Sequence, residues 1–241
     1  MSDIFVLIIV VCVIFLSTLI RSAFGFGNAL VAMPLLALVI GVKEATPLVA
    51  LAGLVIALIM LIREWRELIW KDTLVLLISS MVGLPLGLLM LTAFPENIVR
   101  MFLGVILIGF GLYNLPGIQV PVMEKPALAV PFGFLAGILG GAYNTNGPPV
   151  VIYGVIRGWK KEAFRASLQG FFFVSSLMIV VGHALAGLWS GQILKDFIFS
   201  IPAVVLAVFL GEMIAKKITQ ENFNRVIYTF LILMGLLMFF P

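Results

Sequence analysis

The polar hexapeptide Asn-Thr-Asn-Gly-Pro-Pro at residues 144–149 interrupts two apolar arms, residues 127–143 and 150–156. Hydrophobic residues make up 63% of the 241-residue chain, charged residues 11%, and the mean hydropathy is +1.23, far outside the range of soluble domains. In hydrocarbon every peptide N–H and C=O needs a partner within the protein, so a break at membrane depth survives only where it is buried or lines a cavity. The hexapeptide is therefore a candidate site in a polytopic membrane protein.

The same hexapeptide predicts the start of a helix. Asn146 can act as the N-cap, and Pro148 lacks an N–H that would be unpaired in the first turn anyway. The remaining free amides of that turn point outward, and such a helix end attracts anions.

A second copy of the pattern lies in the first half of the chain. A shift of 118 residues places Asn28 on Asn146 and Lys43-Glu44-Ala45 on Lys161-Glu162-Ala163, and further matches follow at shifts of 124 and 125. A fixed order of matches predicts one unit present twice. We expect a first membrane repeat at 1–117, a linker at 118–126 and a second membrane repeat at 127–241.

Apolar runs of roughly the length of a membrane helix predict an all-α fold. In the first half they cover 4–22, 28–41, 45–62, 73–93 and 97–115, and in the second half 127–142, 147–157, 166–187, 197–214 and 225–240. Several runs beside the two breaks are short. We expect about eight to ten membrane segments, with each half opening on a broken helix pair. Residues 4–20 lack a preceding basic region, so they are expected to be a retained helix rather than a signal peptide.

The basic residues predict that the two halves are inverted. If each broken pair folds back, either as a re-entrant hairpin or as two crossings, eleven basic residues fall on one side of the membrane and three, Lys43, Arg100 and Lys195, on the other. This bias places both termini outside, and Arg21 is left within an apolar stretch. Inverted repeats with discontinuous helices that meet near the midplane are a recurring transporter plan.

The residues at the breaks suit an anion. Two half-helix N-termini facing each other would each offer amide donors and about half a positive charge. Neutral donors would come from four side chains, the glycines would let the backbone approach, and two hydroxyl groups are further candidates. These predicted substrate-binding residues are Asn28, Asn144, Thr145 and Asn146, then Gly25, Gly27 and Gly147, then Tyr153 and Ser22. The alternative is a kink that only lets helices pack.

Two arginines add candidate charges. Arg165 and Gln169 share one helix face at i, i+4, and a guanidinium fits anionic oxygens, although a snorkelling interfacial arginine is the alternative. Arg21 follows about 16 apolar residues, and an ionisable group at that depth is a functional hypothesis by default, unless the first helix simply ends there. We expect Arg165→Gln to weaken anion transport more than Lys160→Gln.

Other classes of function lack the residues they need. Cys12 is the single cysteine, and no carboxylate pair, Walker loop or His-Glu-x-x-His helix is present, so we expect no enzyme, no catalytic or metal site and no cofactor. The net charge of +4 is read as an orientation signal rather than as nucleic-acid binding. Only Glu212 among the carboxylates lies inside an apolar run, and His183 is expected at an interface. An intramembrane enzyme that uses His183 with a nearby serine, a passive anion channel, and a non-catalytic subunit of a membrane complex remain alternatives.

The two breaks, Gly25-Phe26-Gly27-Asn28 and Gly140-Gly141-Ala142-Tyr143-Asn144-Thr145-Asn146-Gly147-Pro148-Pro149, together with the basic run at 160–167, resemble the TauE/SafE family of sulfite and organosulfonate transporters. The resemblance covers nearly the whole chain. It implies transport of a small anion such as sulfite, sulfoacetate, sulfolactate or isethionate across the bacterial inner membrane, without ATP hydrolysis by this chain. Phe24 and Phe26 stand where a denser run of glycines is expected. The lipid bilayer is the expected surrounding, and a homodimer is left open.

Overall fold

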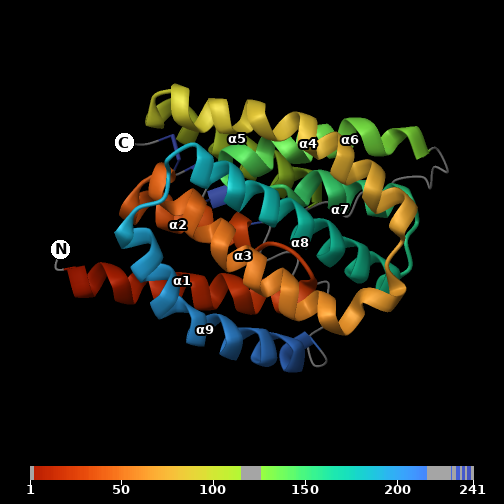
Figure 1. The fold of residues 1–241 in the computed structure, drawn as a ribbon, viewed down its shortest axis with the longest axis horizontal. Helices are drawn as coiled ribbons and strands as arrows, with labels where there is room; N and C mark the ends of the chain where they lie inside the picture. Colours follow the sequence, from red (N-terminus) through yellow and green to blue (C-terminus); the bar gives the residue numbers. More distant parts are fainter. Residues whose placement is uncertain are drawn as a thin grey trace.

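The fold is all-α, with no strand among the residues that the computed structural model describes. These are residues 3–114, 126–215, 229, 232–233, 235–236 and 238–239. This confirms the predicted fold class. In chain order the helices are α1 (Asp3–Phe24), α2 (Asn28–Ile40), α3 (Val42–Glu64), η1 (Trp65–Glu67), α4 (Trp70–Ala93), α5 (Glu96–Asn114), η2 (Pro126–Leu128), α6 (Ala129–Tyr143), α7 (Gly147–Ile156), α8 (Lys161–Leu185) and α9 (Gly191–Ala215) (Figure 1).

Six helices of the described part, namely α1, α3, α4, α5, α8 and α9, are long and apolar enough to cross a membrane. The chain is therefore a multi-pass membrane protein. The other three are short, with 13 residues in α2, 15 in α6 and 10 in α7. Each predicted break separates two helices, since residues 25–27 lie between α1 and α2, and residues 144–146 between α6 and α7.

Several helices begin earlier than their apolar runs. An apolar run ends where charged residues appear, whereas a helix continues through them because its end projects beyond the hydrocarbon. The predicted starts at 45, 73, 166 and 197 become Val42, Trp70, Lys161 and Gly191. Most of the predicted helix at 225–240 and nearly all of the linker lie outside the described residues.

Helices of the two predicted halves exchange partners. α1 packs along α9, α4 packs along α6, and α3 lies against α8 between these two pairs (Figure 1). Suppose that α6 to α9 correspond to α1 to α4. Then α1–α9 and α4–α6 each pair the first helix of one half with the fourth helix of the other, and α3–α8 pairs the third helices of both halves. A two-fold relation between the halves produces this pattern. It supports the division into two repeats, which stays a prediction.

The two short hairpins open at opposite ends of α3. α2 ends at Ile40, and α3 starts at Val42, whose N–H is bonded by Glu96 at the start of α5. α7 ends at the other end, where Arg157 is paired with Asp72 at the start of α4. The breaks consequently reach the middle of the bundle from opposite sides, as inverted halves require.

Glycines bring α4 and α6 into backbone contact. A Cβ added at Gly137 of α6 would lie 2.1 Å from the Ser80 carbonyl oxygen of α4, and one at Gly87 of α4 would lie 2.1 Å from the Ile138 carbonyl oxygen of α6. The same close approach occurs at Gly83, Gly133 and Gly141. Small residues at four-residue spacing are a recurring way to pack helices in lipid. This contact fixes α6, and with it the second break, against α4.

Candidate functional site

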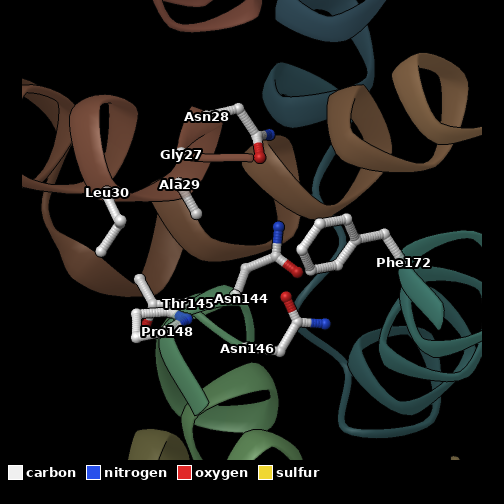
Figure 2. A pocket seen from close by; sticks show the side chains of 10 residues that line it. Gly27, Asn28, Ala29, Leu30, Asn144, Thr145, Asn146, Pro148 and Phe172 are labelled. Atoms are coloured by element: carbon white, nitrogen blue, oxygen red, sulfur yellow. The ribbon is translucent and has the colours of Figure 1, made fainter. Parts of the chain in front are cut away.

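The two breaks line one pocket in the middle of the helices. The first break contributes Gly27, Asn28, Ala29 and Leu30, the second contributes residues 144–148, and α8 contributes Phe172 (Figure 2). In Figure 2 the Asn144 side chain lies between Asn28 above it and Asn146 below it. Three of the predicted site residues thus come together from segments more than 100 residues apart in the sequence.

The backbone at both breaks adopts left-handed conformations. Gly25 has φ 86° and Gly27 has φ 104°, which glycine adopts without steric cost. Asn144 has φ 55°, and asparagine is one of the few other residues that tolerate this region. The N–H of Asn144 bonds to the Gly140 carbonyl at 2.8 Å, so the end of α6 is closed without a glycine.

The two helix starts differ in the number of free amides. The first intrahelical bond of α2 runs from Val31 N–H to Gly27 C=O, which leaves the amides of residues 28–30 without a helical partner. α7 instead carries Pro148 and Pro149 near its start, and neither has an N–H. The α2 end is therefore the richer donor. The Asn146 side-chain oxygen does not form the expected capping bond, and the side-chain Nδ2 donates to Ser175 Oγ of α8 at 2.8 Å.

Arg21 lies beside the pocket, in the last turn of α1, and is only 2% exposed. Its Nη1 donates to Asn28 Oδ1 at 3.3 Å and to the Gly53 carbonyl oxygen of α3 at 3.2 Å. Its Nη2 donates to Gln169 Oε1 of α8 at 3.0 Å, and Gln169 Nε2 donates to the Gly25 carbonyl oxygen at 2.7 Å. Arg21 is thus a bound, interior side chain and not an anchor at the membrane surface.

Two residues near Arg21, Phe172 and Gly53, were not predicted from the sequence. The Phe172 ring lies 4.8 Å from the Arg21 guanidinium carbon and also lines the pocket. A Cβ at Gly53 would lie 3.5 Å from the amide nitrogens of both Asn28 and Asn144. The i+3 spacing of Phe172 from Gln169 is the signal that could have indicated it.

The partners of Arg21 are all neutral. Among the described residues the ion pairs are Arg63–Glu212, Asp72–Arg157 and Glu64–Arg165, and Arg21 takes part in none of them. No acidic residue lines the pocket. Arg21 Nε and Asn144 Oδ1 are buried without a hydrogen-bond partner. A buried cation with a free donor is unfavourable unless an anion joins it.

Three other candidates lie away from the pocket lining. Arg165 is paired with Glu64, with Nη2 and Nε at 2.8 and 3.1 Å from Glu64 Oε1. Tyr153 packs against Phe132 and Trp159, and Ser22 Oγ donates to the Thr18 carbonyl oxygen. Thr145 and Gly147 do line the pocket.

Three titratable groups are more buried than the sequence indicated. His183, expected at an interface, is 0% exposed, and its Nε2 lies 3.4 Å from the Gly141 carbonyl oxygen. Asp72 and Asp196 are buried although they lie near helix starts, because Asp72 is bonded by Arg157 and Asp196 by Gln192. Glu212 pairs with Arg63. Within the described ranges no three His, Cys, Asp or Glu residues are grouped as a metal site would require.

Discontinuous helices whose starts meet at a polar pocket, with a buried arginine beside it, are typical of a polytopic membrane transporter. The chain belongs to the family described as sulfite exporter TauE/SafE, whose sequence profile matches residues 10–238. The members of this family are exporters and not enzymes. The chain is 24% identical over 234 residues to the probable sulfite/organosulfonate exporter TauE of Cupriavidus necator, a match that covers 93% of this chain and 90% of the relative. No solved structure matches the chain significantly.

Proposed function

We propose that this chain carries a small sulfur-containing anion, sulfite or an organosulfonate, across the bacterial inner membrane. The observation that carries the proposal is the Arg21 guanidinium, which is buried between the two breaks and held by both halves without a carboxylate partner. A bound anion would supply the missing negative charge.

The donors around Arg21 suit a head group with three oxygens. A guanidinium presents a planar fork of N–H donors, and the start of α2 adds amides and the positive end of a helix dipole. The side-chain amides of Asn28 and Asn144 face the same space (Figure 2). The Arg21 guanidinium beside this space would repel a cation.

Access to the site needs a conformational change. The free volume of the pocket is about 10 Å³, which is roughly the space of one water molecule. A sulfonate head is larger, so the two breaks have to move apart to admit it. A passive channel would need a continuous path wide enough for the anion, and the small volume of this pocket favours a transporter whose halves alternate.

Export is the direction that we propose, because the relative from Cupriavidus necator is described as an exporter. Sulfoacetate, sulfolactate and isethionate are candidate substrates beside sulfite. The sulfur-bearing head is the part that the donor set recognises, so methanesulfonate is the simplest probe.

Flux of methanesulfonate through the purified chain in liposomes tests the proposal. We expect saturable flux that acetate competes for weakly, and we expect Arg21→Gln to lower the apparent affinity by roughly a hundredfold, because a charged donor is lost. Arg66→Gln, which removes an exposed arginine, is the matched control. Flux that rises linearly with concentration would indicate a channel, and unchanged transport by Arg21→Gln would contradict the proposed site.

A further inference from the structure

The ion pairs of the described residues share two properties. Each joins the first half of the chain to the second, and all three lie at one end of the bundle, where α3 and α9 end and α4 and α8 begin. This is the end that the basic residues place in the cytoplasm. At the opposite end the described residues form no ion pair.

One of these pairs, Arg165–Glu64, lies next to the first break. Arg165 is one helical turn from Gln169, which holds Arg21. The Arg165 side chain also lies against the first break, since a Cβ added at Gly25 would lie 3.5 Å from Arg165 Cγ. An anion that moves from Arg21 toward this end of α8 therefore meets Arg165 next.

The carboxylate of Glu64 binds the Arg165 guanidinium in the way that an anionic substrate would. Glu64 Oε1 accepts both bonds from Arg165, whereas Glu64 Oε2 is buried and has no hydrogen-bond partner. Both side chains are part-buried, with 21% and 26% of their surfaces exposed. A pair of this kind exchanges partners more easily than a fully buried one, because water replaces lost bonds.

We infer that the Arg165–Glu64 pair is the gate between the anion site and the cytoplasmic end, with Glu64 holding the place of the anion on Arg165. This inference rests on the proposed function. When the halves separate at this end, the anion replaces Glu64 on Arg165, so Arg165 is a second binding position on the path. The pairs Arg63–Glu212 and Asp72–Arg157 flank the gate and keep the same end closed.

Equilibrium binding of methanesulfonate to the purified chain tests the gate. We expect one anion per wild-type chain and two per Glu64→Gln chain, the second roughly tenfold weaker because Arg165 is partly in water. Glu212→Gln frees the neighbouring Arg63 at the same end and is the matched control, which should still bind one. The double variant Glu64→Gln/Arg165→Gln should return to one.

A single anion bound by Glu64→Gln, with the wild-type affinity, would overturn the gate while leaving the Arg21 site intact. Two anions bound by Glu212→Gln would also overturn it, because the effect would then be general to this end. No binding by the wild-type chain would contradict the proposed function itself. Glu64→Asp, which draws the carboxylate back by one methylene, provides a milder variant that should bind a second anion more weakly still.

Discussion

Arg21 and Gln169 lie 148 residues apart in the sequence and are joined by a hydrogen bond of 3.0 Å in the interior of the protein. The bond connects the end of α1 to the middle of α8, and Gln169 returns a second bond to the backbone of the first break. The two halves are thus linked through the one buried guanidinium that has no ion-pair partner among the described residues.

The α4–α6 contact should not tolerate a methyl group. Gly137→Ala places a Cβ against the Ser80 carbonyl oxygen, so we expect a loss of about 1 to 3 kcal/mol in the free energy of unfolding. Gly109→Ala in α5 is the control, because a Cβ there has no atom within 4 Å. Unfolding in mixed micelles, followed by circular dichroism, measures both. Equal stability of the two variants would mean that α4 and α6 do not approach as closely as described.

The Asp72–Arg157 pair should stabilise the fold. Arg157 Nε donates to Asp72 Oδ2 at 3.0 Å, and this hydrogen bond raises the pKa of Arg157 above its ordinary value. Asp72 also accepts from Trp159. We expect Asp72→Asn to cost about 1.5 to 3 kcal/mol of unfolding free energy, as loss of a bond to a charged group does.

A double-mutant cycle separates this pair from its surroundings. Asp72→Asn/Arg157→Gln should lose less stability than the sum of the two single variants, because the partner removed second has already lost its contact. Strictly additive losses would show that the pair contributes nothing as a pair.

The sequence predicted that Arg165→Gln would weaken anion transport much more than Lys160→Gln, and the contact between Arg165 and Glu64 changes this expectation. Because Glu64 occupies Arg165, we now expect Arg165→Gln to change the affinity of the Arg21 site by less than about fivefold, the range of partly exposed ion pairs. Lys160→Gln serves as the surface-charge control. Methanesulfonate binding measures both, and a hundredfold loss in Arg165→Gln alone would place the anion at Arg165 rather than at Arg21.

The predicted inversion of the halves can be tested on the described loops. In a Cys12→Ser background, a cysteine at Lys195 should react with an impermeant maleimide in whole cells, whereas one at Lys160 should react only after permeabilisation. Cys12 is exposed and has to be removed first. Labelling of Lys160 but not of Lys195 in intact cells would reverse the topology.

Local signals were enough to predict the breaks. The breaks contain residues that favour helix ends and helix starts, namely Gly25 and Gly27 in the first and Asn144-Thr145-Asn146-Gly147-Pro148-Pro149 in the second. The close packing of α4 on α6 was not predicted. Its sequence signal is the four-residue spacing of the glycines at 83 and 87, and at 133, 137 and 141.

The sequence did not predict which side chains Arg21 and Arg165 contact. Arg21 and Arg165 look alike as arginines at helix ends, yet one meets a glutamine and the other a glutamate, and both partners come from the other half of the chain. Such pairings depend on how α1 and α3 lie against α8, which no local pattern encodes. Ser22 and Tyr153 were also predicted at the site, but Ser22 Oγ donates to the Thr18 carbonyl oxygen within α1, and Tyr153 packs against Trp159.

Binding of methanesulfonate to Gln169→Glu tests the central claim most directly. The substitution keeps the oxygen that Arg21 bonds and replaces Nε2, which donates to the Gly25 carbonyl oxygen, by a second carboxylate oxygen. Arg21 thereby gains an ion-pair partner. Thr92→Glu adds the same charge at an exposed position of α4 and is the control. If the unpaired charge of Arg21 binds the anion, Gln169→Glu should bind roughly a hundredfold more weakly while the protein stays folded and Thr92→Glu binds normally. Wild-type affinity in folded Gln169→Glu would contradict the account.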